Sequence, residues 1–138
     1  MAHPLIRVAA ADDVDAVLEL WRRADTAPSA TDDPESVERV VASGQVLVAE
    51  ADGQIVGTLI ATFDGWRGNM YRLAVDPRHR REGVARALVA RGEQLLVERG
   101  ARRISALVLS GEDHATEFWS AAGYELQTGI ARYVKTVR

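Results

Sequence analysis

Four arginines and a glycine lie close together in the middle of the chain, and together they could hold an anion. Arg78, Arg80, Arg81 and Arg86 surround Gly83, where the apolar residues 70–75 give way to a helical pattern. The first N–H groups of a helix have no partner inside it, and the aligned peptide dipoles place about half a positive charge there. Glycine has no Cβ, so a phosphate can approach the main chain closely. We therefore predict an anion site at a helix N-terminus.

The spacing Arg80-x-x-Gly83-x-Ala85 resembles the signature with which the GNAT N-acetyltransferase family holds the pyrophosphate of acetyl-coenzyme A (acetyl-CoA). Two further segments fit the family, in the same order along the chain. The triplet Leu73-Ala74-Val75 precedes the signature, where relatives have the strand that pairs with the pantetheine arm. Residues 115–124 are similar to the family's later helix-to-strand segment. The resemblance covers most of the chain.

This resemblance implies an α/β fold in a single domain, residues 1–138, with a mixed sheet of about six to seven strands flanked by about four helices. It implies an enzyme that transfers the acetyl group of acetyl-CoA, as co-substrate, directly to a primary amine of a small molecule, a peptide or a protein. A backbone amide at Ala74 or Val75 would stabilise the oxyanion. The implied cofactor contacts are Leu73, Ala74, Val75, Arg80, Arg81, Glu82, Gly83, Val84, Ala85, Arg86, His114 and Trp119.

The acid and base of the reaction do not carry over from the family. Relatives often use a tyrosine to protonate the leaving thiolate, but Trp119 stands at that position, and an indole N–H is far too weak an acid. Some relatives place a glutamate base where this chain has Asn69. We predict water-mediated proton removal, with Tyr71 or Tyr124 as the catalytic side chain. Tyr71 alternates with Leu73 and should share its face of the strand.

Other side chains near the expected site have both a functional and a structural interpretation. Glu112 and His114 could act in proton transfer or simply occupy the first turn of a helix. Arg132 and Tyr133 could line the acceptor site, and Trp66, between two glycines, could contact a substrate or fold back on the sheet. A site without a strong base favours an acceptor of low pKa. At neutral pH, deprotonating a lysine costs about 4 kcal/mol and an α-amine about 1 kcal/mol.

The periodicity of the chain supplies elements that would position these residues. Strands are expected at residues 5–9, 46–50, 55–63, 70–75, 103–109, 124–127 and 130–137. Asp12 or Asp13 should cap a first helix, Asp33-Pro34 should open a second, and a third should run from the glycine motif to Arg99. Ser110-x-x-Asp113 is typical of a capping box before a fourth helix. Since a helix joins strands 70–75 and 103–109, these two strands should be parallel.

Composition excludes several classes of protein. The 138 residues are 47% hydrophobic and 27% charged, as in a globular domain, and no cysteine is present for a disulfide, thiolate metal site or nucleophile. We expect no metal, no membrane segment and a cytoplasmic location. The net charge of −3 argues against a nucleic-acid partner. Neither an ATP-type P-loop nor the dinucleotide glycine motif is present.

Two questions stay open at this level. The first is whether the chain is instead a catalytically silent acetyl-CoA-binding module that regulates another protein. The second is its oligomeric state, since small relatives are often homodimers. The acidic residues of the first forty positions could suit a cationic acceptor, or could be helix caps and solvated faces.

Overall fold

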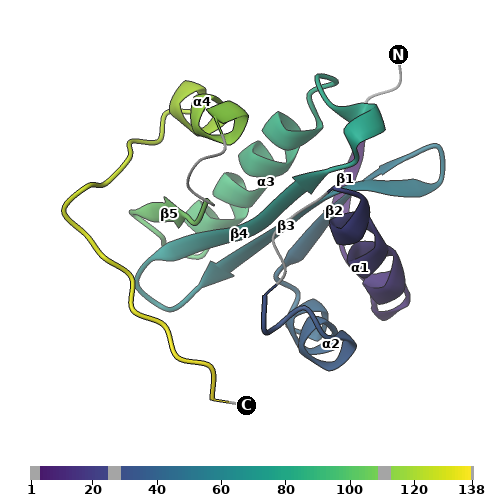
Figure 1. Cartoon of the computed structure of the whole chain (residues 1–138), viewed down its shortest axis with the longest axis horizontal. Coiled ribbons are helices and arrows are strands. Elements are labelled where there is room, and N and C mark those ends of the chain that lie inside the picture. Colours follow the sequence, from purple (N-terminus) through teal and green to yellow (C-terminus); the bar gives the residue numbers. More distant parts are fainter. Residues whose placement is uncertain (1–3, 25–28, 109–112, 138) are drawn as a thin grey trace. The chain divides into compact units, whose positions relative to one another are not determined.

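The computed structural model describes residues 4–24, 29–108 and 113–137. It divides the chain into two compact units, Met1–Leu107 and Val108–Arg138 (Figure 1). The first unit contains a five-stranded sheet with three α-helices, and the second contains one α-helix followed by an extended segment. No helix in these described ranges is both long and apolar enough to cross a membrane. The expectation of a single domain stays a prediction.

The sheet follows the order of the chain. Its strands lie in the order β1-β2-β3-β4-β5, with the first three pairings antiparallel and β4 parallel to β5. The parallel pair is joined through a helix, as the sequence predicted. The strands are β1 (Leu5–Val8), β2 (Val46–Ala51), β3 (Gln54–Phe63), β4 (Gly68–Val75) and β5 (Ile104–Ala106).

Helices cover both faces of this sheet (Figure 1). On one face, α1 (Val14–Arg23) and α2 (Pro34–Ala42) bury a core that includes Val46 and Val48 of β2. On the other face lies α3 (Val84–Glu98). A Cβ added at Gly57 of β3 would come within 2.7 Å of Val84 in α3. This close packing is possible only because the strand carries a glycine there.

Two local signals in the sequence produce the structures that they predicted. The side chain of Asp33 accepts a hydrogen bond from the Ser36 amide at 3.0 Å and so caps α2, with Pro34 in the first turn. Asp52 and Gly53 both have positive φ, 53° and 77°, in the turn between β2 and β3. Two positive φ values in sequence are the geometry of the tight hairpin turn that an Asp-Gly pair favours.

The cap of the first helix differs from its prediction. A short 3-10 helix, η1 (Ala11–Asp13), precedes α1. Asp13 is the N-cap residue of α1, but its side chain makes no capping hydrogen bond to α1. Its carboxylate instead accepts the Ala10 amide at 2.7 Å and pairs with Arg7 of β1. The Arg7 guanidinium lowers the pKa of Asp13 below its usual value. Asp13 therefore ties the start of the helix to the sheet.

The last two predicted strands are wrong. Residues 124–137 form no strand, and the described chain has five strands rather than six to seven. Apolar residues in this segment, such as Leu126 at 83% and Tyr133 at 94%, are exposed. High β-propensity predicts a strand only where a neighbouring edge pairs with it and buries one face. The fifth strand is also shorter than the predicted 103–109, whose last residue lies outside the described ranges.

Strand β4 contains a bulge. Tyr71 pairs with Ile60 and Ala74 with Thr58, so two residues of β4, Arg72 and Leu73, lie opposite the single Leu59. Arg72 has φ +54°, in the left-handed region that non-glycine residues seldom adopt. An extra residue reverses the alternation of side chains, so β4 presents different faces before and after the bulge.

Candidate functional site

The turn between β4 and α3 is built on the buried carboxylate of Asp76. Asp76 is 2% exposed, accepts the amide of Arg78 at 3.0 Å and so caps the 3-10 helix η2 (Pro77–His79). Its Oδ2 also pairs with Arg78 and with Arg23 of α1, each at 3.2 Å. The Arg78 side chain is the main cause that lowers the pKa of Asp76 to about 2. Asp76 thus fixes the turn that leads into the predicted anion site and connects it to α1.

Beyond this turn, the N-terminus of α3 has the geometry that the glycine motif predicted. Gly83 is the N-cap residue, with φ +83° and no side-chain cap, and Arg81 before it has φ +67°. A Cβ built at Gly83 would meet no atom within 4 Å, so glycine serves the backbone conformation and leaves open space before the helix. The uncapped amides that follow are suited to bind an anion.

The charged side chains around this helix end are also exposed and could contact an anion. Arg80, Arg81, Glu82 and Arg86 are exposed, and none of these three arginines forms an ion pair with another described residue. The side chain of Val84 is 3% exposed and belongs to the contact between α3 and the sheet. Of Val84, only the main chain is therefore suited to contact a cofactor. Positive charge and free amides meet at one end of α3.

The edge of β4 next to β5 is open beyond the first half of the strand. The parallel ladder ends at Met70, whose carbonyl accepts the Leu107 amide at 3.0 Å, and no described strand pairs with this edge from Tyr71 onward. Asp76 N donates to Val56 O, so alternation directs the main chain of Ala74 toward β3 and that of Val75 toward the open edge. Of the two amides expected for the oxyanion, only that of Val75 is directed toward the open edge.

The bulge overturns the expectation that Tyr71 and Leu73 share one face. Tyr71 is paired with Ile60, which packs against the core under α1 and α2. Ala74, beyond the bulge, belongs to that same core, so the intervening Leu73 faces α3. Residues 71 and 73 would share a face only in a regular strand, and the extra residue at Arg72 interrupts that alternation.

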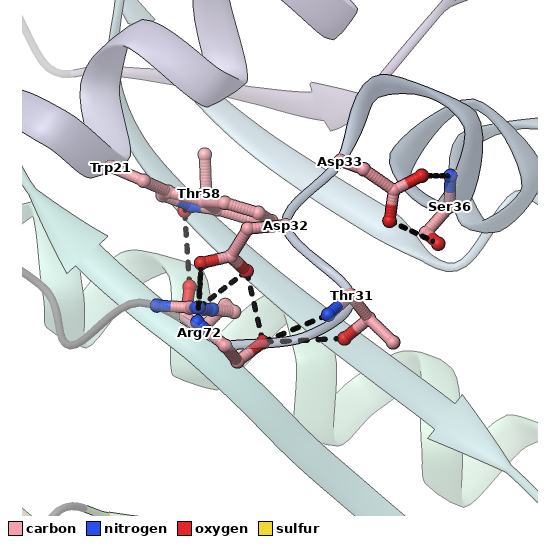
Figure 2. Close-up of polar contacts among 8 residues, drawn as sticks. Trp21, Thr31, Asp32, Asp33, Ser36, Thr58 and Arg72 are labelled. Atoms are coloured by element: carbon pink, nitrogen blue, oxygen red, sulfur yellow. Dashed lines mark hydrogen bonds and ion pairs between the residues drawn. The ribbon is translucent and has the colours of Figure 1, made fainter. Parts of the chain in front are cut away.

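A polar network that sequence reasoning missed lies on the α1 side of the bulge (Figure 2). The Trp21 indole donates to Thr58 Oγ1 at 2.9 Å, and that hydroxyl donates to the carbonyl of Arg72 at 3.0 Å. The Arg72 guanidinium lies 4.8 Å from the centroid of the Trp21 ring and pairs with both carboxylate oxygens of Asp32. Thr58 and Arg72, a polar and a charged residue among the mainly apolar residues of two strands, were the signal available in the sequence.

The second unit contains α4 (Asp113–Ala121) and the other predicted site residues. Trp119 is 9% exposed, with its ring 5.3 Å from Phe118 and 4.9 Å from Tyr124, both edge-on. Trp119 and Tyr124 therefore pack together. The cofactor contact of Trp119 and the role of Tyr124 in proton transfer stay predictions. Arg132 and Tyr133 are exposed. Glu112, Ser110 and the side chain of His114 lie outside the described residues.

Trp66 lies in the turn between β3 and β4 and is 70% exposed. This exposure shows that the ring does not fold back on the sheet, and the Arg67 guanidinium lies 4.0 Å from the ring centroid. The Asp64 carboxylate holds this turn by accepting the amides of Trp66 and Arg67 at 2.9 and 2.7 Å. Trp66 thus remains available for contact, although no described residue links it to the other site residues.

The site thus combines an open edge on β4 of a mixed sheet with a glycine-capped helix that follows it and is flanked by exposed arginines, an arrangement suited to an anionic group. The model of the acetyltransferase (GNAT) family matches residues 14–124. An acetyltransferase of Sodalis glossinidius is 35% identical over 127 residues, covering 91% of this chain and 89% of its own. The chain therefore belongs to the GNAT acetyltransferase family.

Solved structures agree on the fold. The PaiA N-acetyltransferase of Thermoplasma acidophilum, in complex with coenzyme A, superposes with a TM-score of 0.82 at 16% identity, covering 92% of each chain. The aminoglycoside N-acetyltransferase AAC(6')-Iy, in complex with CoA, gives a TM-score of 0.78 at 20% identity, covering 98% of this chain and 96% of its own. These structures confirm the α/β fold class that the sequence predicted.

Proposed function

We propose that this protein transfers the acetyl group of acetyl-CoA to a primary amine of a small molecule, a peptide or a protein. The observation that carries the proposal is the uncapped N-terminus of α3, with Gly83 at φ +83° and exposed arginines beside it, directly after an open strand edge. Family membership and the coenzyme A complexes of structural neighbours support it. The AAC(6')-Iy neighbour, an aminoglycoside N-acetyltransferase, supports an amine as acceptor.

In the proposed complex the cofactor is held at both ends. The backbone amides of residues 81–86 bind the pyrophosphate, and the side chains of Arg80, Arg81 and Arg86 add charge at the rim. The pantetheine arm pairs with the open edge of β4 at Leu73–Val75. His114 and Trp119 complete the proposed cofactor contacts. This arrangement leaves the acetyl group beside the bulge of β4.

The chemistry is a direct displacement at the thioester carbonyl. The amine nitrogen attacks the carbonyl carbon, a C–N bond forms, and the negative charge on the oxygen is stabilised by an amide of β4. Collapse of the tetrahedral intermediate breaks the C–S bond and releases the CoA thiolate, which takes up a proton. The amine loses a proton through water, with Tyr71 or Tyr124 as the proposed side chain in proton transfer.

A panel of amines tests the proposal. Purified protein is incubated with acetyl-CoA and a peptide with a free α-amine, a lysine peptide with a blocked N-terminus, or an aminoglycoside. Free thiol and acetylated amine are both measured, so that hydrolysis is told from transfer. We expect equal amounts of thiol and acetylated product with at least one amine, and faster transfer to the α-amine than to lysine. Acetyl-CoA binding without turnover across the panel would support the silent regulatory module instead.

A further inference from the structure

The peptide bond between Arg72 and Leu73 is held by a buried chain of hydrogen bonds. The Trp21 indole donates to Thr58 Oγ1 at 2.9 Å, and the same hydroxyl donates to the Arg72 carbonyl at 3.0 Å (Figure 2). Thr58 is 0% exposed and Trp21 is 5% exposed. Because the indole can only donate, the threonine hydroxyl is left to direct its own hydrogen at the carbonyl.

This chain of bonds also sets the direction of an amide on the other side of the strand. No described peptide bond is cis, and in a trans peptide the carbonyl and the N–H point in opposite directions. A carbonyl of Arg72 that points to Thr58 on β3 therefore directs the Leu73 N–H away from β3. The edge of β4 on that side has no described strand partner at this level.

The bulge needs this support because its backbone is strained. Arg72 holds φ +54° without being glycine, a conformation that persists only where the surroundings impose it. Its carbonyl is fixed by Thr58, and its guanidinium by the Trp21 ring and by Asp32. Arg72 thus has three contacts at the bulge, and the hydrogen bond from Thr58 is the one that fixes its carbonyl. Thr58 therefore differs from a buried threonine whose hydrogen bond only satisfies its own hydroxyl.

We propose that Thr58, supported by Trp21, is a positioning residue for acetyl transfer. It fixes the Arg72–Leu73 peptide so that the Leu73 N–H, in place of the Ala74 or Val75 amide expected from the sequence, points at the thioester carbonyl oxygen and stabilises the charge that develops there. The inference rests on the proposed function. Loss of an oxyanion donor lowers kcat by about 100- to 1,000-fold, and loss of its support should cost about 10- to 100-fold.

The test uses acetyl-CoA labelled with ¹³C at the carbonyl, bound to the wild type, Thr58→Val, Thr58→Ser and Thr62→Val. Valine keeps the shape of threonine without its hydroxyl, serine restores the hydroxyl, and Thr62 lies on the same strand outside the network. A hydrogen bond to the carbonyl lowers its infrared stretching frequency. We expect the lowered frequency in the wild type, Thr58→Ser and Thr62→Val, and a frequency near that of free acetyl-CoA in Thr58→Val.

Kinetics give a second readout with an amine that the wild type acetylates. Thr58→Val should lower kcat by about 10- to 100-fold with little change in KM for acetyl-CoA, because the pyrophosphate contacts are intact. If Thr58→Val does not fold, Trp21→Phe keeps an aromatic ring beside Arg72 but removes the indole N–H, and it should shift the carbonyl frequency in the same direction by less.

The outcomes separate the two proposals. A wild type that does not bind acetyl-CoA contradicts the proposed function, and this inference with it. A wild type that binds acetyl-CoA without lowering the carbonyl frequency, or a folded Thr58→Val or Trp21→Phe that keeps the wild-type frequency, overturns the inference alone.

Discussion

At the scale of single residues, Asp76 shows how one buried carboxylate organises a turn. It receives the Arg78 amide and two guanidinium groups, and its pKa falls to about 2, chiefly through the Arg78 side chain. A folded-state pKa below the unfolded value of 3.8 stabilises the fold above about pH 4. That stabilisation is lost as the pH falls through 4 toward 2. The aspartate is therefore a stabilising group at neutral pH.

Replacing Asp76 by asparagine should make this contribution measurable. The shift in pKa corresponds to about 2 kcal/mol, and solvent around the exposed Arg78 side chain reduces it, so we expect Asp76→Asn to lose about 1 to 2 kcal/mol at pH 7. Urea unfolding at pH 7, 5, 4 and 3 checks this, with the exposed Asp12→Asn as control. The wild-type advantage should shrink below pH 4. A constant difference across this range would contradict the assigned ion pairs.

The tyrosines present the other question at this scale. The bulge places Tyr71 on the α1 side of the sheet and Leu73 on the α3 side, so the sequence argument for Tyr71 loses its geometric basis. If the hydroxyl of Tyr71 or of Tyr124 takes part in proton transfer, replacing that tyrosine by phenylalanine should lower kcat by about 10-fold or more. The pH profile of kcat with an amine acceptor measures this. Two variants with wild-type profiles would remove both tyrosines from the mechanism.

At the scale of elements, the position of α3 depends on its contact with β3. A Cβ at Gly57 would lie 2.7 Å from Val84 and 2.9 Å from Leu88, both in the first turns of the helix. A Cβ at Gly92, farther along α3, would similarly lie 2.8 Å from Leu59 of β3. The two glycines allow the helix to lie close to the sheet along its length, and only the first is next to the proposed pyrophosphate site.

Gly57→Ala should therefore affect both stability and cofactor binding. Overpacking in a core costs about 1 to 3 kcal/mol, and here it displaces the helix turn that carries the anion-binding amides. We expect a higher Kd for CoA, measured by calorimetry. Gly92→Ala is the matched control, because it crowds the same helix away from its N-terminus and should leave the Kd unchanged. Equal effects of the two variants on the Kd would contradict this account.

The segment that leads into α2 is held on β4 by Asp32. Its carboxylate pairs with Arg72, and side-chain exposures of 25% and 15% place this pair between surface and core. We expect Asp32→Asn to cost about 1 to 3 kcal/mol and to speed hydrogen exchange at residues 29–33. Glu35→Gln, which breaks an exposed pair with Arg39, should change neither. Unchanged exchange in Asp32→Asn would show that the pair does not hold this segment.

At the scale of the whole molecule, the sequence predicted what depends on local pattern. The Asp-Gly turn, the Asp33 cap and the glycine-capped α3 follow from backbone preferences of particular residues, so they could be read directly. The bulge at Arg72 could not, because it arises from contacts to Trp21, Thr58 and Asp32, far away in the sequence. The strands predicted after Gly123 failed because propensity does not say whether a pairing edge is present.

The same division applies to the site. The glycine-capped N-terminus of α3, where we propose the anion site, was predictable because the residues that form it are consecutive. The proposed positioning of the Leu73 amide was not, since it depends on a threonine in β3 and a tryptophan in α1. Site geometry built from distant elements becomes visible only in the folded chain.

The central claim is that acetyl-CoA is anchored at the N-terminus of α3. Thermal unfolding with acetyl-CoA, CoA or ATP, for the wild type, Gly83→Glu and Gly53→Glu, tests it most directly. Gly53 has a similar φ of +77° and equally open space, so its variant controls for strain and charge. Ligand at about 100 times Kd should add about 2.7 kcal/mol, a shift of several degrees. We predict this shift for the wild type and Gly53→Glu with acetyl-CoA and with CoA, but not with ATP. For Gly83→Glu we predict no shift with any of the three ligands. No shift with either coenzyme, or a full shift in Gly83→Glu, would contradict the account.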